Sequence, residues 1–147
     1  MVDKNAENTE MVDETTGEVK TNTFEPLQYA TFDMSDVKNR VRVFNAHNSA
    51  KSLKTIGDTQ LNIVDVLAEP GKRARSGNLC QNTYLFTDDN LVFFTQSTGI
   101  ARTVNELVEM VQGDFLKNTT NGYVTVQMVE TKLSGDRTYK QFQLIAA

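Results

Sequence analysis

The stretch Tyr84–Val111, "YLFTDDNLVFFTQSTGIARTVNELVEMV", changes its hydrophobic pattern halfway along. Its first part holds two apolar runs separated by "TDDN", which is typical of two strands joined by a tight turn. Its second part has the spacing of one helix face, with Ser97 or Thr98 placed to cap the start and Gly113 just past the end. The sequence therefore predicts a hairpin followed by one amphipathic helix. The apolar residues on that helix face are Ile100, Val104, Leu107, Val108 and Val111.

Upstream, "NRVRVFNA" (Asn39–Ala46) alternates, with Val41 and Val43 on one side. Such alternation is typical of a half-buried strand whose other face looks outward. We therefore expect a strand here with a basic, partly aromatic outer face. The residues on the outer face are Arg40, Arg42 and Phe44.

Two more regions read as strands. "TQLNIVDVLAE" (Thr59–Glu69) is a continuous apolar run that we expect to end at the turn residues Pro70 and Gly71. Downstream, "GYVTVQMVETKL" (122–133) and "TYKQFQLIA" (138–146) alternate on either side of "SGDR", which predicts a closing hairpin. The side chains expected to face inward from this hairpin are Val124, Val126, Met128, Phe142 and Leu144.

The order of strands, one helix and a final hairpin predicts a mainly β fold. It matches a five-stranded OB barrel with one α-helix before the last two strands. An SH3-like barrel would be shorter and lack the helix, and an immunoglobulin-like sandwich would have more strands. We expect the barrel to span residues 24–147 and an acidic N-terminal arm to span residues 1–23.

Composition favours a single soluble domain. A chain of 147 residues, 39% hydrophobic, is long enough for one core and too short for two comfortable ones. Its apolar runs are far shorter than the ~18 residues that cross a bilayer, and it begins with polar and acidic residues. The single cysteine, Cys80, excludes an internal disulfide, which fits a reducing compartment. We therefore expect a cytoplasmic protein.

Charge is divided unevenly along the chain. Residues 1–36 hold nine acidic and two basic residues, a net −7, whereas residues 37–147 hold thirteen basic and ten acidic residues, a net +3. The arm has few apolar residues and no periodicity, so alone it is expected to be flexible. It is a solvated tail, a tail that docks on a neighbouring subunit in a homo-oligomer, or a tail that covers a basic groove. The candidate anchors for oligomerisation are Met11, Val12 and Phe24.

Short motifs in this order resemble a known family. They are "ATFD" (Ala30–Asp33), "VFNA" (Val43–Ala46), "SLK" (Ser52–Lys54), and "YLFTDDNLVFFTQS" (Tyr84–Ser97) leading into "TVNELVEMV". Together they are similar to the small single-stranded-DNA-binding proteins of Gram-positive phages and conjugative plasmids, closest to the type of protein-primed Bacillus phages. The resemblance covers most of the chain from Tyr29 onward. It implies an OB fold that coats single-stranded DNA during replication or conjugative transfer, without catalysis.

The cations are the first candidates for DNA contact. Lys72, Arg73 and Arg75 lie close together in "GKRARSG" (Gly71–Gly77), where they could continue a phosphate-binding groove, although a loop that only aids solubility is an alternative. In an OB barrel the loop after the first strand and the loop between the last two strands flank the binding face. We expect Lys51 and Lys54 in the first loop. In or beside the second we expect Lys132, Arg137, Tyr139 and Lys140. Scattered lysines are more often plain surface. The further candidate cations are Arg40, Arg42, Lys51, Lys54, Lys132, Arg137 and Lys140.

Aromatic rings are the second requirement, because bases stack on them. Phe44 and Tyr139 are the better stacking candidates, since their parity opposes the expected core. Tyr84 is ambiguous, because it shares the parity of a neighbouring core residue. The rings expected to fill the barrel are Phe86, Phe93 and Phe142.

Catalytic readings find little support. His47 and Cys80 are the only residues of their types, which excludes the usual Cys/His zinc sites and a supported Ser-His-Asp constellation. Asp88 and Asp89 fit a turn, and no phosphate-binding glycine loop occurs, so no cofactor is expected. The favoured function is a coat for single-stranded DNA, with RNA as a possible ligand. The alternative is an assembly module that uses the barrel for protein contacts and the tail for oligomerisation.

Overall fold

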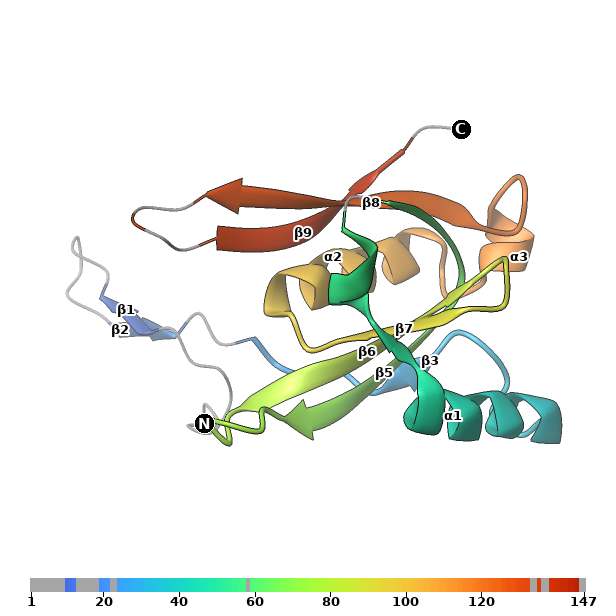
Figure 1. Cartoon of the computed structure of the whole chain (residues 1–147), viewed down its shortest axis with the longest axis horizontal. Coiled ribbons are helices and arrows are strands. Elements are labelled where there is room, and N and C mark those ends of the chain that lie inside the picture. Colours follow the sequence, from blue (N-terminus) through green and yellow to red (C-terminus); the bar gives the residue numbers. More distant parts are fainter. Residues whose placement is uncertain are drawn as a thin grey trace.

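The structure, a computed structural model, describes residues 10–12, 19–21, 24–57, 59–132, 135 and 138–145, and the side chains of 24–57, 59–130, 135 and 141–145. Helices and strands alternate irregularly along the chain (Figure 1). In chain order they are β1 (Glu10–Val12), β2 (Val19–Thr21), β3 (Tyr29–Ala30), α1 (Val37–Ser49), β4 (Lys51–Ser52), the 3-10 helix η1 (Leu53–Ile56), β5 (Gln60–Lys72), β6 (Leu79–Thr87), β7 (Val92–Thr95), α2 (Thr98–Met110), α3 (Phe115–Asn118), β8 (Val124–Lys132) and β9 (Thr138–Leu144).

Most strands join one curled sheet. Its order is β4-β7-β6-β5-β8-β9, and β3 pairs with β5. The 13-residue β5 is shared between two parts of the sheet, because it pairs with β8 through Gln60–Ile63 and with β6 from Ile63 to Lys72. A bulge between Ile63 and Asp65 bends it between these parts. The sheet thereby folds around α2 (Figure 1).

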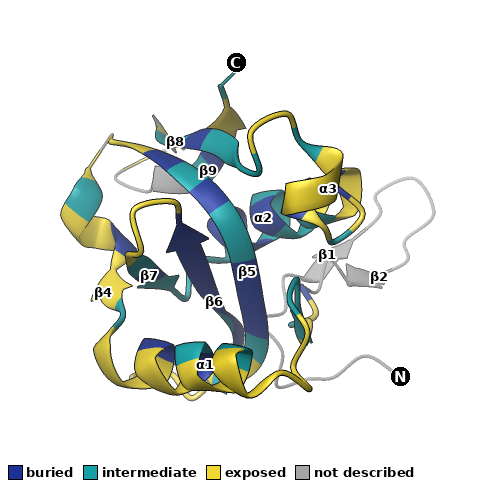
Figure 2. Cartoon of the chain, turned by 90° about the vertical axis from the view of Figure 1, so that its right-hand side faces the viewer, coloured by how far each residue is buried: buried dark blue, intermediate teal, exposed yellow. Residues whose placement is uncertain are grey.

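The two faces of β6 are buried against different helices (Figure 2). Leu85 faces the inner cluster around α2, whereas Tyr84 and Phe86 face α1, as the alternation of a strand requires. The inner cluster is the larger one. It comprises Leu53, Leu61, Ile63, Val66, Leu85, Phe93, Ile100, Val104, Leu107, Val111, Phe115, Val126 and Phe142.

The locally encoded elements agree with the sequence analysis. Ser97 caps α2, and its side chain accepts a hydrogen bond from the main-chain N–H of Ile100. Gly113 follows the helix at a φ of +75°, where glycine is favoured. The hairpins β6–β7 and β8–β9 are both antiparallel, as predicted. Burial of Phe86, Phe93 and Phe142 is confirmed.

The expected strand at Asn39–Ala46 is wrong, because these residues form part of α1. The Asp36 side chain accepts from the main-chain N–H of Lys38 and caps the helix. Val43 and Ala46, three residues apart, are buried against the sheet, whereas Val41 is 54% exposed. The alternation misled because both sides of this helix carry apolar residues, so its pattern has no clear helical period.

Two further details differ from expectation. Pro70 and Gly71 do not end β5 but pair with Gln81 and Cys80 of β6. Proline is tolerated there because the pairing of β5 with β3 ends at Ala68, so the missing N–H breaks no rung of that ladder. At the other end of the fold, Leu144 was expected inside but is 47% exposed.

The arrangement is consistent with an OB-like barrel, but the number of strands and the placement of helices differ from the expected five strands and one helix. The short strands β3 and β4 extend the sheet, and α1 stands where the first strand was expected. Among the described residues, no helix is long and apolar enough to cross a membrane.

Candidate nucleic-acid interface

The basic loop, Lys72–Asn78, joins β5 to β6 at one end of the molecule (lower left in Figure 1). Its main chain closes on itself, because Arg73 N–H donates to the Asn78 carbonyl and Gly77 N–H donates to the Arg73 carbonyl, both at 2.9 Å. The side chains of Lys72 and Arg75 are exposed. The sequence thus places two cations in solvent on a loop whose shape is held by its own hydrogen bonds.

Arg73 has a different role from its two neighbours. Its guanidinium Nη2 donates to the Gln96 carbonyl and to the Thr98 hydroxyl, each at 3.1 Å. These acceptors lie at the junction of β7 and α2, so the side chain points back onto the body. Arg73 therefore positions the basic loop, and a phosphate contact by Arg73 stays a prediction.

A polar strip leads from the basic loop to an aromatic ring that the sequence analysis missed. The Gln96 amide donates to Asn82 Oδ1 at 2.9 Å and to the Lys72 carbonyl at 3.3 Å. Phe94 of β7 lies two residues before Gln96 and is only half-buried. Its parity, opposite to that of the buried Phe93, was the available signal.

Tyr84 belongs to the packing under α1. It is 7% exposed, and its ring lies 5.1 Å from the ring of Phe94 and 5.5 Å from that of His47. Burial, and secondly the charge of Glu69, raise the pKa of its hydroxyl. The ring is therefore covered, so the structure assigns the ambiguous Tyr84 to packing, and Phe94 is the more accessible member of this pair.

Arg42 is likewise engaged inside the molecule. Its guanidinium donates to Asp65 Oδ2 at 3.1 Å and lies 4.8 Å from the ring centre of Phe32 and 4.7 Å from that of Phe86. The outward orientation expected from a strand is wrong, because the helical turn of α1 directs this side chain toward the sheet. Arg42 fastens α1 to the body and has its charge neutralised there.

The remaining α1 and β4 candidates are exposed. Arg40 and Phe44 lie on the solvent side of α1, and Phe44 is 66% exposed. Lys51 and Lys54 are exposed on β4 and η1. Because β4 pairs with β7, with Ser52 opposite Phe94, these lysines stand beside the strand that carries the half-buried ring.

The structure does not describe the side chains of the remaining candidates for DNA contact and oligomerisation. The main chains of Lys132, Tyr139 and Lys140 belong to β8 and β9, but their side chains are not described, and Arg137 is outside the described residues altogether. The side chains of Met11 and Val12 are likewise not described, although their main chain forms β1.

Phe24 packs on its own chain. It is 7% exposed, and the guanidinium of Arg102 lies 5.6 Å from its ring centre. An anchor for a neighbouring subunit must offer an exposed side chain, so the expectation for Phe24 is corrected: this ring fastens the root of the N-terminal arm to α2.

The chain matches the model of one protein family, described as "Phage Single-stranded DNA-binding protein", over residues 20–144. The match runs from β2 to the end of β9 and therefore includes the basic loop, the outer face of β6 and β7, and α1. No curated protein and no solved structure matches the chain.

Proposed function

The chain belongs to the phage single-stranded DNA-binding protein family, and we propose that it coats single-stranded DNA without sequence specificity and without catalysing a reaction. The observation that carries this proposal is the basic loop, in which Arg73 is fastened to the body while Lys72 and Arg75 face solvent. Preorganised cations of this kind neutralise phosphates without reading bases. Phage replication is the process we propose, and plasmid replication or conjugative transfer would require the same chemistry.

We further propose that the barrel is of the OB type. The order β5, β6, β7, α2, α3, β8, β9 supports this assignment, because five consecutive strands of the sheet have helix α2 and the short α3 before the last two. In OB barrels, the loop between strands one and two and the loop between strands four and five flank the nucleic-acid face. The first of these is then the basic loop, rather than the segment with Lys51 and Lys54. The second is the β8–β9 connection with its candidates Lys132, Arg137, Tyr139 and Lys140.

The proposed path of the DNA strand crosses the outer face of β6 and β7. Phosphates contact Lys72 and Arg75, a base stacks on the half-buried ring of Phe94, and Lys51 and Lys54 supply charge beside β7. The amides of Asn82 and Gln96 line the path between loop and ring with neutral polar groups. Stacking on rings is tolerant of sequence, because every base has a π-face.

A salt titration tests the proposed function. Fluorescence anisotropy of a labelled oligothymidine is followed at several salt concentrations, with a duplex of equal length as the control. We expect tight binding to the single strand that weakens steeply with salt, because counterions are released from phosphates. Equal affinity for the duplex, or a flat salt dependence, would contradict the proposal. An oligouridine run in parallel measures whether RNA is also a ligand.

For the N-terminal arm, we propose docking on an adjacent subunit through Met11 or Val12. The support is charge: residues 1–36, which include the arm, carry a net −7, whereas residues 37–147 carry a net +3. Removing residues 1–23 should then lower the cooperativity of DNA binding, measured by mass photometry on long single strands. Unchanged cooperativity with higher affinity would instead identify a tail that competes with DNA, and no change in either would identify an inert tail.

A further inference from the structure

Helix α1 carries apolar residues on the side that faces solvent as well as on the side that faces the sheet. Val37, Val41 and Phe44 are 62%, 54% and 66% exposed. Their spacing of four and three residues places them in one line along the helix. Val43 and Ala46 are buried on the opposite side. We name the exposed line the α1 stripe; within the described residues, nothing covers it.

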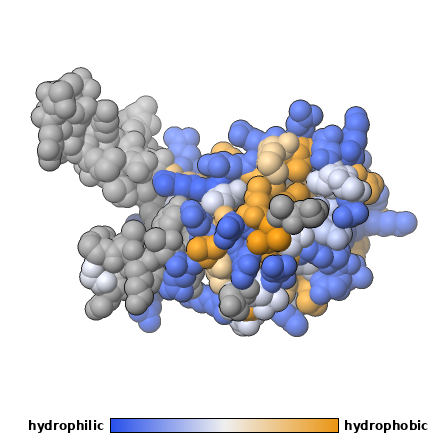
Figure 3. Space-filling model, turned by 90° about the horizontal axis from the view of Figure 1, so that it is seen from above, coloured by the Kyte–Doolittle hydropathy of each residue, from blue (hydrophilic) through white to orange (hydrophobic). Residues whose placement is uncertain are grey.

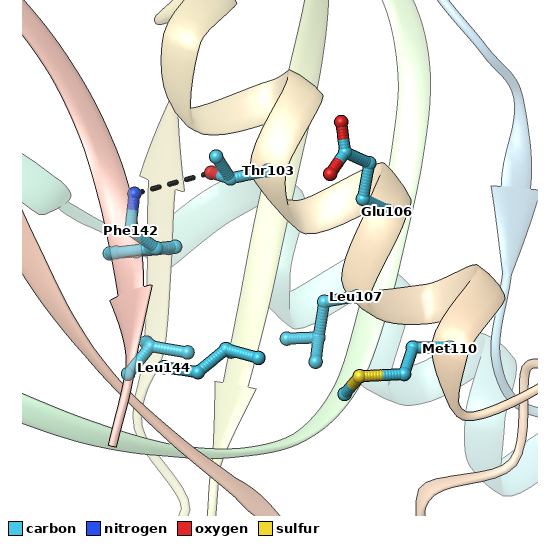
Figure 4. A pocket seen from close by; sticks show the side chains of 7 residues that line it. Thr103, Glu106, Leu107, Met110, Phe142 and Leu144 are labelled. Carbon is cyan, nitrogen blue, oxygen red and sulfur yellow. Dashed lines mark hydrogen bonds between the residues drawn. The ribbon is translucent and has the colours of Figure 1, made fainter. Parts of the chain in front are cut away.

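The second feature is a groove between α2 and β9 (Figure 4). Its volume is about 290 Å³. The main-chain N–H of Phe142 donates to the Thr103 hydroxyl at 3.2 Å, which holds the two walls together. Met110 and Leu144 line the groove while remaining 58% and 47% exposed. Residues from α2 and β9 in this α2–β9 groove are Thr103, Glu106, Leu107, Met110, Phe142 and Leu144.

The two features match in length, size and charge. The α1 stripe spans the eight residues from Val37 to Phe44, and the helical wall of the groove spans the eight from Thr103 to Met110, each about 10 Å along the helix axis. An apolar cavity of about 150 Å³ already holds a benzene ring, so the groove accepts the ring of Phe44. The charges are complementary, because Arg40 borders the stripe and the exposed Glu106 borders the groove.

We propose that the α1 stripe of one copy docks into the α2–β9 groove of a second copy. The helix α1 and the strands β8 and β9 lie at opposite ends of the molecule (Figures 1 and 2). The side that carries β8 and β9 shows an apolar patch in the space-filling view (Figure 3). A contact between two different surfaces does not close on itself, so repetition yields an open row of subunits. Such a row suits a protein that covers a linear strand, but the contact itself needs no DNA.

The test uses one substitution in each surface, Phe44→Asp and Met110→Asp, followed by sedimentation velocity without DNA from micromolar to millimolar protein. Both residues are more than half exposed, so the fold should survive, which circular dichroism checks. Each variant alone should associate about 10- to 100-fold more weakly than the parent chain, as burial of one large side chain predicts. An equimolar mixture should form dimers and stop there, because the pair retains one intact stripe and one intact groove that meet.

Charge reversal supplies a second, independent readout. Arg40→Glu and Glu106→Arg should each weaken association, and the double variant should restore it, because the pair is recreated with opposite sign. The matched control is Leu116→Asp, since Leu116 is 82% exposed on α3 and outside the groove. Association of this control should equal that of the parent chain.

Three outcomes would overturn the proposal. A parent chain that stays monomeric at all concentrations would show that the surfaces do not meet. Undiminished association of Met110→Asp alone would show that two stripes pair with each other or that another surface is used. If the substitutions leave association unchanged and only removal of residues 1–23 abolishes it, the contact between copies is made by the N-terminal arm.

Discussion

The guanidinium group of Arg73 donates a 3.1 Å hydrogen bond to the main-chain carbonyl of Gln96, which ties the basic loop to the end of β7. In the opposite direction, the side-chain amide of Gln96 donates to the Lys72 carbonyl at 3.3 Å. The loop between two strands is thereby fixed to a third strand. Since Arg73 is used for this attachment, the three cations of the loop divide into one positioning residue and two exposed ones.

Replacing Lys72 and Arg75 together with alanine should weaken binding to single-stranded DNA and reduce its salt dependence. Each lost phosphate contact should lower the slope of log K against log salt by about 0.7. Stability should hardly change, because both side chains are exposed. The measurement is anisotropy at several salt concentrations. Lys117→Ala, which removes an exposed cation from α3, is the control, and an equal effect of this control would refute a specific role for the loop.

Arg73→Ala should act differently from that double variant. It removes hydrogen bonds from a charged donor to Gln96 and Thr98, which should lower the free energy of unfolding by about 1–3 kcal/mol. Urea unfolding measures this loss. If Arg73→Ala keeps full stability and only weakens DNA binding, the assignment of Arg73 as a positioning residue is wrong.

Phe94→Leu should weaken DNA binding by about 1–3 kcal/mol, because leucine keeps apolar volume against Tyr84 but offers no π-face to a base. Phe94→Tyr retains the ring and should bind nearly as the parent chain does. Both affinities are measured with oligothymidine, and both melting temperatures are recorded. Equal affinity of the leucine and tyrosine variants would exclude stacking on this ring. The same measurement applies to Phe44 and Tyr139, for which stacking remains a prediction.

Arg42→Ala should destabilise the fold by about 1–3 kcal/mol. It leaves the half-buried Asp65 without its ion pair and removes the cation that lies over the rings of Phe32 and Phe86. Urea unfolding of Arg42→Ala, Asp65→Asn and the double variant yields the coupling between the two residues. A coupling energy near zero would mean that the ion pair between Arg42 and Asp65 does not help to fasten α1 to the sheet.

Stability should fall at alkaline pH because of two tyrosines. Burial raises the pKa of the Tyr29 and Tyr84 hydroxyls above their ordinary value of 10.0, and the charge of Glu69 adds to the shift of Tyr84. A raised folded-state pKa means that the unfolded chain loses its protons first, so the stabilisation is complete below about pH 10 and is lost as pH rises further. Urea midpoints measured from pH 8 to pH 11 should decline less for Tyr29→Phe/Tyr84→Phe. A parallel decline would contradict the assignment.

The locally encoded parts of the fold were predictable from the sequence. The period of α2, its Ser97 cap and the glycine beyond its end depend on residues a few positions apart, and so do the turns of the β6–β7 and β8–β9 hairpins. The clustering of Lys72 and Arg75 on one exposed loop was equally visible, because neighbours in sequence stay neighbours in space. The burial of Phe86 and Phe93 followed from parity within their strands.

Contacts between distant segments decided the rest. Whether Asn39–Ala46 is helix or strand depends on burying Val43 and Ala46 on the outer face of β5 and β6, and that surface exists only once the sheet has formed. Tyr84 became a covered ring rather than a binding one because α1, about forty residues earlier in the chain, lies over it. Arg73 became an anchor because β7, the strand after β5 and β6, ends beside the basic loop and brings Gln96 within hydrogen-bond reach. The sequence by itself determined the hydrophobic periodicity, the turns and the distribution of charge. The tertiary structure decided the role of each cation and each ring, because it placed a distant residue beside it. Burial and pairing depend on position in space and not on neighbours in the sequence.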